Sequence, residues 1–92
     1  MSLQKRVVVT GLGQLSPLGN DYRTAWKNCV SGKNGITSAE FDIKDCPVQV
    51  AGRLFDFNVE NYLPTKLSRR IDPFIQYGIV AANESIKDSG FL

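Results

Sequence analysis

The residues of this sequence best suited to binding chemistry are three closely spaced cations. Lys66, Arg69 and Arg70 fall at positions i, i+3 and i+4, so a helix over residues 65–70 would place all three charges on one face. Arginine can bind carboxylates and phosphates through two parallel hydrogen bonds, and complementary charge orients an acidic partner. The three cations therefore indicate either an ordinary solvated surface or a docking site for an acidic protein or a phosphate group.

Side chains that could support covalent or metal chemistry are few. The sequence contains Cys29 and Cys46 and no histidine, so no Cys–His or Ser–His pair can activate a nucleophile. A zinc site normally requires more cysteine and histidine ligands than these two thiols. We therefore expect both cysteines to be free, unreactive, small apolar side chains in a reducing compartment. We expect no catalytic residue, metal or cofactor within these 92 residues.

The glycines that follow the first valine run resemble a dinucleotide-binding loop only in part. Ser16 stands where that motif has its third glycine. A proline and a further glycine delay the next helix, so its N-terminus could not lie under a pyrophosphate. Residues 32–35 lack the spacing and the Gly-Lys-Ser/Thr ending of a P-loop. We expect Gly11 and Gly13 to permit a tight, buried turn instead.

The composition argues against several other classes of protein. Eleven basic and nine acidic residues give a formal charge of +2, which is too small to indicate nucleic-acid binding by itself. The longest apolar run is far shorter than a membrane span. The short valine run after Lys5 and Arg6 is not the apolar region of a signal peptide. The sequence therefore predicts a cytoplasmic protein that binds neither nucleic acid nor a membrane.

The elements that would position these residues begin with a buried strand and an amphipathic helix. Residues 7–9 form a continuous β-branched run, which is typical of a strand covered on both faces. After an irregular loop, Asn20 or Asp21 can cap a helix that Gly32 ends. The apolar positions of this helix have the spacing of a single face; they are Tyr22, Ala25, Trp26, Cys29 and Val30.

The middle of the chain predicts little regular structure. Residues 36–46 have no clear period and are expected to form a surface loop. A short strand is expected over residues 48–51, ended by Gly52. Residues 56–64 are expected to be irregular, and a short helix is expected over residues 65–70, where the three cations lie.

A longer helix is predicted over residues 73–89. Asp72 is a suitable capping acceptor, Pro73 suits the first helical position, and Gly90 suits the end. Apolar and small side chains occupy much of the circumference of this helix, so it should be covered on more than one side. The rest of the chain offers too few elements to cover it. The sequence therefore predicts part of an α/β fold whose remaining neighbours lie in other sequence.

Four segments follow one another in an informative order: residues 6–13 (RVVVTGLG), 16–20 (SPLGN), 66–78 (KLSRRIDPFIQYG) and 88–92 (DSGFL). Together they resemble the N-terminus of the β-ketoacyl-acyl carrier protein synthases, in particular the elongating synthases II of type II fatty acid synthesis. The resemblance extends from Lys5 to Leu92. Members of this family are several times longer than the 92 residues of this chain.

The resemblance implies a thiolase-like layered α/β fold made of duplicated halves, which assembles as a homodimer. Residues 1–92 would be an N-terminal segment of the N-terminal domain, incomplete as a catalytic unit. In this family an acyl group passes from acyl carrier protein to a cysteine and is condensed with the carbanion formed by decarboxylation of malonyl-carrier protein. That cysteine and two histidines would lie beyond Leu92, so the segment alone should be inactive. Lys66, Arg69 and Arg70 match basic positions that dock the acidic carrier protein.

Two other interpretations remain open from the residues themselves. The face formed by residues 66–70 could belong to a non-catalytic module that binds any acidic or phosphorylated partner. Alternatively, the chain could be a purely structural half that completes a second polypeptide. The intact mass of the native protein would separate these interpretations, because a mass several times that of this chain supports the enzyme.

Overall fold

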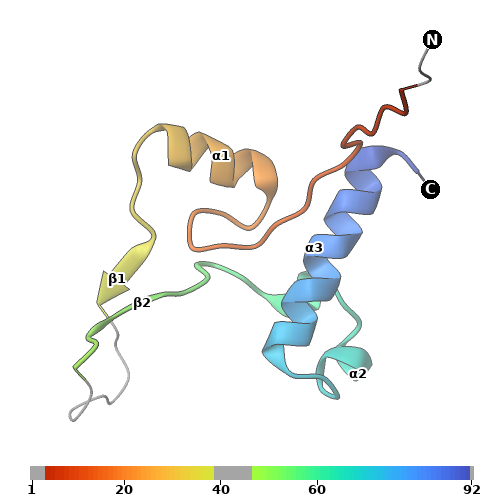
Figure 1. Cartoon of the computed structure of the whole chain (residues 1–92). Coiled ribbons are helices and arrows are strands. Elements are labelled where there is room, and N and C mark those ends of the chain that lie inside the picture. Colours follow the sequence, from red (N-terminus) through yellow and green to blue (C-terminus); the bar gives the residue numbers. More distant parts are fainter. Residues whose placement is uncertain (1–3, 39–46, 92) are drawn as a thin grey trace.

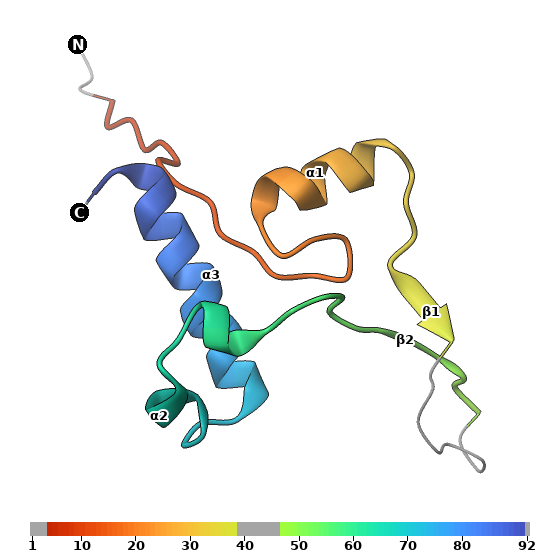
Figure 2. The ribbon, with the colours of Figure 1, turned by 180° about the vertical axis from the view of Figure 1, so that it is seen from behind.

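The computed structural model describes residues 4–38 and 47–91. In chain order the elements are α1 (Tyr22–Val30), β1 (Ile36–Ser38), β2 (Val50–Gly52), a 3-10 turn (Val59–Asn61), α2 (Thr65–Ser68) and α3 (Pro73–Ser89). In Figure 1 and Figure 2 the start of α1 faces α3, the β1–β2 hairpin projects away from α3, and the short α2 lies near the start of α3. The molecule is elongated, and its longest dimension is 64 Å.

Helix α1 begins and ends as its sequence predicts. Asp21 is the N-cap, and its carboxylate accepts a 2.8 Å hydrogen bond from the backbone N–H of Thr24. This bond satisfies one of the four N–H groups that the first turn of a helix leaves without an intrahelical partner. Gly32 has a φ of +83° and donates its N–H to the carbonyl of Cys29. The left-handed conformation, which glycine adopts easily, therefore ends the helix.

Helix α3 also has its predicted bounds, but one detail of its cap was wrong. Gly90, with a φ of +70°, ends the helix. At the start, the carboxylate of Asp72 makes no capping hydrogen bond. The backbone carbonyl of Asp72 instead accepts the N–H groups of Ile75 and Gln76 at 3.0 and 3.1 Å. Pro73 has no N–H to satisfy and fits the first helical position for that reason.

The two strands form an antiparallel pair in which Ile36 lies opposite Gly52 and Ser38 opposite Val50. β2 agrees with the predicted strand to within two residues. The prediction of a loop over residues 36–46 was wrong at its start, because β1 occupies Ile36–Ser38. A strand of three residues is too short to show an alternating period, and its pairing with β2 is what defines it. The rest of that predicted loop, with Cys46, lies outside the described residues.

The predicted buried strand at residues 7–9 is the clearest difference between sequence and structure. Val7, Val8 and Val9 belong to no strand, and their exposed fractions are 94%, 67% and 79%. A strand requires a neighbour that pairs with its backbone, and no described part of the chain provides one. The three valines are suited to burial, as the sequence pattern indicates, but the described residues of this chain do not bury them.

The core is small and lies between α3 and the segment that precedes α2. Within the described residues, Leu63 and Val80 are its buried hydrophobic side chains. Phe57 stacks on Tyr62 at 5.3 Å between ring centroids and meets Tyr77 edge-on at 5.5 Å. These ring contacts attach the segment around residues 57–62 to α3. The prediction of an irregular segment was wrong at Val59–Asn61, which form the 3-10 turn.

Much of α3 remains exposed, as its sequence predicts. Phe74 is 71% exposed, and Ile75 and Ile86 are each 39% exposed. The described residues combine helices with strands, as expected for α/β architecture, but their only sheet has two strands. The layered arrangement implied by the family resemblance is therefore not formed within the described segment.

The chain crosses α3 at very close range where it passes Gly11 and Gly13. A Cβ atom added at Gly11 would overlap the carbonyl oxygen of Ser85, and one added at Gly13 would overlap the carbonyl oxygen of Ala81. The same added atom at Gly13 would also lie 2.8 Å from the backbone nitrogen of Ser85. The two glycines thus allow a tight backbone approach to α3. The prediction of a buried turn was wrong, because both glycines are half-buried and neither lies in a turn.

Candidate functional site

The three predicted binding cations lie on α2 and the turn that follows it. We call Lys66, Arg69 and Arg70 the basic face. Arg69 has helical dihedral angles (φ −75°, ψ −14°) and donates its N–H to the carbonyl of Thr65 at 3.1 Å. Arg70 donates its N–H to the carbonyl of Leu67 at 3.0 Å. Helical hydrogen bonding therefore continues through the arginine pair, and the i, i+3, i+4 spacing places the three residues on one side.

The side chains of the basic face are available to a partner. All three residues are exposed, and within the described part of the chain none of them forms an ion pair. Exposed cations that are not used internally can meet an acidic surface without first breaking a contact. The structure brings together the three residues that the sequence singled out.

Helix α2 is a single turn that depends on neighbouring residues. Ser68 is buried, and its hydroxyl donates to the carbonyl of Thr65 at 3.1 Å. From the first turn of α3, the side-chain amide of Gln76 donates to the carbonyl of Ser68 at 2.8 Å and to that of Ile71 at 3.4 Å. No local sequence pattern indicates this contact between Gln76 and the preceding turn.

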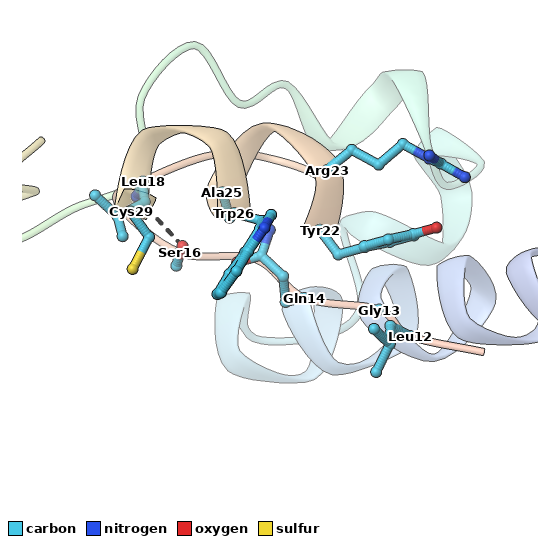
Figure 3. A pocket seen from close by; sticks show the side chains of 10 residues that line it. All are labelled: Leu12, Gly13, Gln14, Ser16, Leu18, Tyr22, Arg23, Ala25, Trp26 and Cys29. Carbon is cyan, nitrogen blue, oxygen red and sulfur yellow. Dashed lines mark hydrogen bonds between the residues drawn. The ribbon is translucent and has the colours of Figure 1, made fainter. Parts of the chain in front are cut away.

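A separate apolar hollow lies beside α1, between this helix and the loop that precedes it (Figure 3). Its volume is about 750 Å³. Trp26 stands at this hollow with 69% of its surface exposed. Arg23 is the only charged residue among those that line it, which are Leu12, Gly13, Gln14, Ser16, Leu18, Tyr22, Arg23, Ala25, Trp26 and Cys29. The apolar face of α1 forms one wall of the hollow. In the described structure, no other helix or strand packs against this face.

Cys29 lies in this hollow as a free, exposed thiol. The expectation of a free thiol is confirmed for Cys29. The side chain is exposed because the face of α1 that carries it is uncovered. No lining residue can act as a base toward the thiol, since the titratable neighbours are Tyr22 and Arg23. Among the described residues that line the hollow, Cys29 therefore has no base beside it.

Two carboxylates on α3 hold the loop and the start of α1 in place. Glu84 accepts the N–H of Gln14 and the N–H of Tyr22, both at 2.9 Å. Asp88 accepts the N–H of Leu12 at 3.1 Å and the hydroxyl of Tyr22 at 2.6 Å. Glu84 and Asp88 are four residues apart, which places them on the same face of the helix. The four hydrogen bonds that these carboxylates accept connect α3 to residues 12–22, which are distant in sequence.

The contacts of Asp88 predict a pH-dependent stability. The Tyr22 hydroxyl, and then the N–H of Leu12, hold the pKa of Asp88 below its ordinary value. Asp88 therefore stabilises the fold above the ordinary carboxyl pKa, and this contribution is lost as the pH falls through the lowered folded value. The hydrogen bond to Asp88 raises the pKa of Tyr22 above 10.0. The stability that this hydrogen bond adds through Tyr22 is present below the ordinary tyrosine pKa. It is lost as the pH rises through the raised pKa of the folded protein.

Thermal melts at a series of pH values check this prediction. In a full-length protein that carries this segment, Asp88→Asn should flatten the acidic limb of the stability profile, and Tyr22→Phe should flatten the alkaline limb. Glu60→Gln is the control, because Glu60 is an exposed carboxylate on the 3-10 turn. If Asp88→Asn and the control give the same profile as the unchanged protein, the assignment of the acidic limb to Asp88 is wrong.

Other kinds of site are absent from the described residues. In residues 4–38 and 47–91, no group of three or more histidine, cysteine, aspartate or glutamate side chains could hold a metal ion. Over the same residues, no helix is long and apolar enough to cross a membrane. The basic face, the hollow beside α1 and the carboxylates of α3 are candidate functional features of these residues.

Comparison with known proteins identifies the family. Residues 4–92 match the model of the beta-ketoacyl synthase N-terminal domain. The chain is 49% identical over 90 residues to a 3-oxoacyl-[acyl-carrier-protein] synthase 2 of Staphylococcus aureus (strain COL), and the match covers 97% of this chain and 22% of that protein. It is 43% identical over 88 residues to the protein of the same name from Vibrio cholerae serotype O1, covering 95% of this chain and 21% of the relative.

These matches confirm the resemblance drawn from the sequence. The chain spans about a fifth of the length of the relatives it matches. The relatives are synthases, which gives no support to the alternative of a non-catalytic binding module. The chain belongs to the family of the β-ketoacyl synthase N-terminal domain, and it corresponds to an N-terminal segment of a synthase of the 3-oxoacyl-[acyl-carrier-protein] synthase 2 type.

Proposed function

We propose that the chain is part of an enzyme that condenses malonyl-carrier protein with an enzyme-bound acyl group during fatty acid elongation. The proposal rests on the family match over residues 4–92 and on the names of the relatives. The reaction belongs to the whole synthase, which we propose to be a cytoplasmic homodimer with a thiolase-like fold. The described segment supplies no base beside Cys29, so the nucleophile and its histidines are assigned to the rest of the protein.

Within that enzyme, we assign the docking of acyl carrier protein to Lys66, Arg69 and Arg70. The observation that supports this role most directly is that three exposed cations share one side of a fixed turn and make no ion pair within the described residues. An acidic partner would be steered toward this surface and held in one orientation by several charges at once. The role is one of encounter and positioning, remote from the chemical step.

Reversal of the three charges tests the docking role. In the full-length synthase, the combined change Lys66→Glu, Arg69→Glu and Arg70→Glu should reduce kcat/KM for carrier-protein substrates by roughly tenfold or more, since each exposed pair contributes about 0.2–1 kcal/mol and reversal adds repulsion. Activity with small acyl-thioester donors should be retained. Added salt should reduce the preference of the unchanged enzyme for carrier-bound donors, because the Debye length is about 10 Å at 0.1 M ionic strength.

A matched control separates docking from a general effect of charge. The change Lys5→Glu, Lys27→Glu and Lys33→Glu alters the net charge by the same amount at exposed lysines away from α2, and it should leave the ratio of carrier-bound to small-donor activity unchanged. If the basic-face variant loses activity equally on both kinds of donor, the damage lies in folding or catalysis. The docking assignment would then be withdrawn.

A further inference from the structure

The side-chain amide of Gln76 makes two hydrogen bonds on either side of the two arginines of the basic face. Its Nε2 group donates to the carbonyl of Ser68, one residue before Arg69, at 2.8 Å, and to the carbonyl of Ile71, one residue after Arg70, at 3.4 Å. Both contacts are part-buried. A side chain of the long helix α3 is thereby tied to both ends of the arginine pair.

Helix α2 needs such support because it is very short. It has four residues, whereas isolated helices shorter than about 12–15 residues are marginal in water. The last carbonyls of a helix have no intrahelical partner. Pro64, at the N-cap position, provides no side-chain cap, and neither does Asp72 at the start of α3. The side-chain amide of Gln76 donates hydrogen bonds to carbonyl groups of the turn that would otherwise lack a donor.

We propose that Gln76 is a positioning residue for carrier-protein docking. It fixes the backbone of Ser68 and Ile71, and with it the direction in which Arg69 and Arg70 leave the surface. Cations held in one arrangement lose less freedom when a partner binds than cations on a mobile turn. The inference rests on the docking role proposed for the basic face and adds a residue that touches neither the partner nor the reacting groups.

The variant Gln76→Met, made in the full-length synthase, tests this role because methionine keeps a similar length and lacks the donor. We expect KM for the carrier-bound substrate to rise by about two- to tenfold. The 2.8 Å bond to Ser68 should account for most of this rise, since one hydrogen bond contributes about 0.5–1.5 kcal/mol and the bond to Ile71 is long. The value of kcat and the activity with a small acyl-thioester donor should stay unchanged. Asn83→Met is the matched control, because Asn83 is an exposed amide on the same helix that makes no hydrogen bond in the described segment, and it should leave KM unchanged.

Hydrogen exchange gives a second readout that does not depend on activity. The backbone N–H groups of Arg69 and Arg70 donate within the turn, so their protection should fall in Gln76→Met and remain in Asn83→Met. Gln76→Glu provides a second variant of nearly the same shape, in which a carboxylate faces two carbonyl oxygens. It should raise KM and lower protection at least as much as Gln76→Met.

The outcomes separate this inference from the docking proposal. If charge reversal on the basic face raises KM for the carrier-bound substrate and both Gln76 variants leave it unchanged, Gln76 has no positioning role. If charge reversal itself has no selective effect, the docking role is wrong and the role of Gln76 in docking is overturned with it. A Gln76 variant that lowers kcat on small donors as strongly as on carrier-bound donors would also overturn the inference, since a positioning residue for docking should spare the chemical step.

Discussion

Replacing Gly13 with valine should strongly destabilise the synthase. An added Cβ atom would overlap the carbonyl oxygen of Ala81, and the atoms it meets belong to the backbone of α3. A backbone cannot move aside as the end of a long side chain can, so either α3 or the crossing loop must shift. We expect a loss of at least about 3 kcal/mol in the free energy of unfolding, the upper part of the range for overpacked sites. Denaturant unfolding of the purified protein measures this loss.

Gly32→Asn is the matched control for that change. Gly32 is also a loop glycine, but a Cβ atom there would meet nothing within 4 Å, and asparagine tolerates its φ of +83°. The control should therefore unfold at nearly the same denaturant concentration as the unchanged protein. Equal stabilities for Gly13→Val and Gly32→Asn would show that the loop does not cross α3 at the described distance.

Loss of the Glu84 carboxylate should have the second largest effect. This side chain accepts the N–H groups of Gln14 and Tyr22, and Tyr22 begins α1, where a negative charge also interacts favourably with the helix dipole. Glu84→Leu leaves both part-buried donors without an acceptor. Since a hydrogen bond to a charged group contributes about 1.5–3 kcal/mol, we expect a loss of about 3 kcal/mol in the free energy of unfolding. Hydrogen exchange should show the loss first at the start of α1.

A graded variant distinguishes hydrogen bonding from packing. Glu84→Gln keeps the shape of the side chain and one acceptor oxygen, but it places a donor amide opposite a second donor. Its stability should lie between those of the unchanged protein and Glu84→Leu. If Glu84→Gln and Glu84→Leu are equally stable, Glu84 stabilises the fold through packing of its side chain rather than through the two hydrogen bonds that it accepts.

The sequence predicted best those features that depend on residues close together in the chain. The end of α1 at Gly32 and the ends of α3 at Pro73 and Gly90 were predicted, and the N-cap of α1 was narrowed to Asn20 or Asp21. Glycine, proline and short polar side chains restrict the backbone at their own positions. The limited cover of α3 was also predicted, since its apolar residues extend beyond one stripe. These features are expressed within one or two helical turns of sequence.

Features that require a distant partner were missed. Residues 7–9 have the composition of a buried strand but find no neighbour in the described structure, and β1 became a strand only because β2 pairs with it. The contacts of Glu84 and Asp88 join residues about 60 to 80 positions apart. No period or spacing in a single sequence records such pairs, because they form only when the chain folds.

The candidate site was predicted in part for the same reason. Spacing alone placed Lys66, Arg69 and Arg70 on one side of a turn, and helical hydrogen bonds run through that turn. The attachment of the turn to α3 through Gln76 could not be predicted, because a glutamine in the first turn of a helix has no preferred distant acceptor. The docking role itself stays a proposal that the charge reversal is designed to test.

The uncovered face of α1 also makes the segment spectroscopically useful. Trp26 is the single tryptophan of the 92-residue chain, and it stands at the hollow beside α1 with 69% of its surface exposed. Indole fluorescence shifts to shorter wavelength when water is removed from the ring, so emission from this one side chain reports whether the hollow is open or covered. The thiol of Cys29 lines the same hollow and offers a point for attaching a second chromophore. Binding of another protein surface over the hollow can therefore be followed by the fluorescence of Trp26, without an introduced tryptophan.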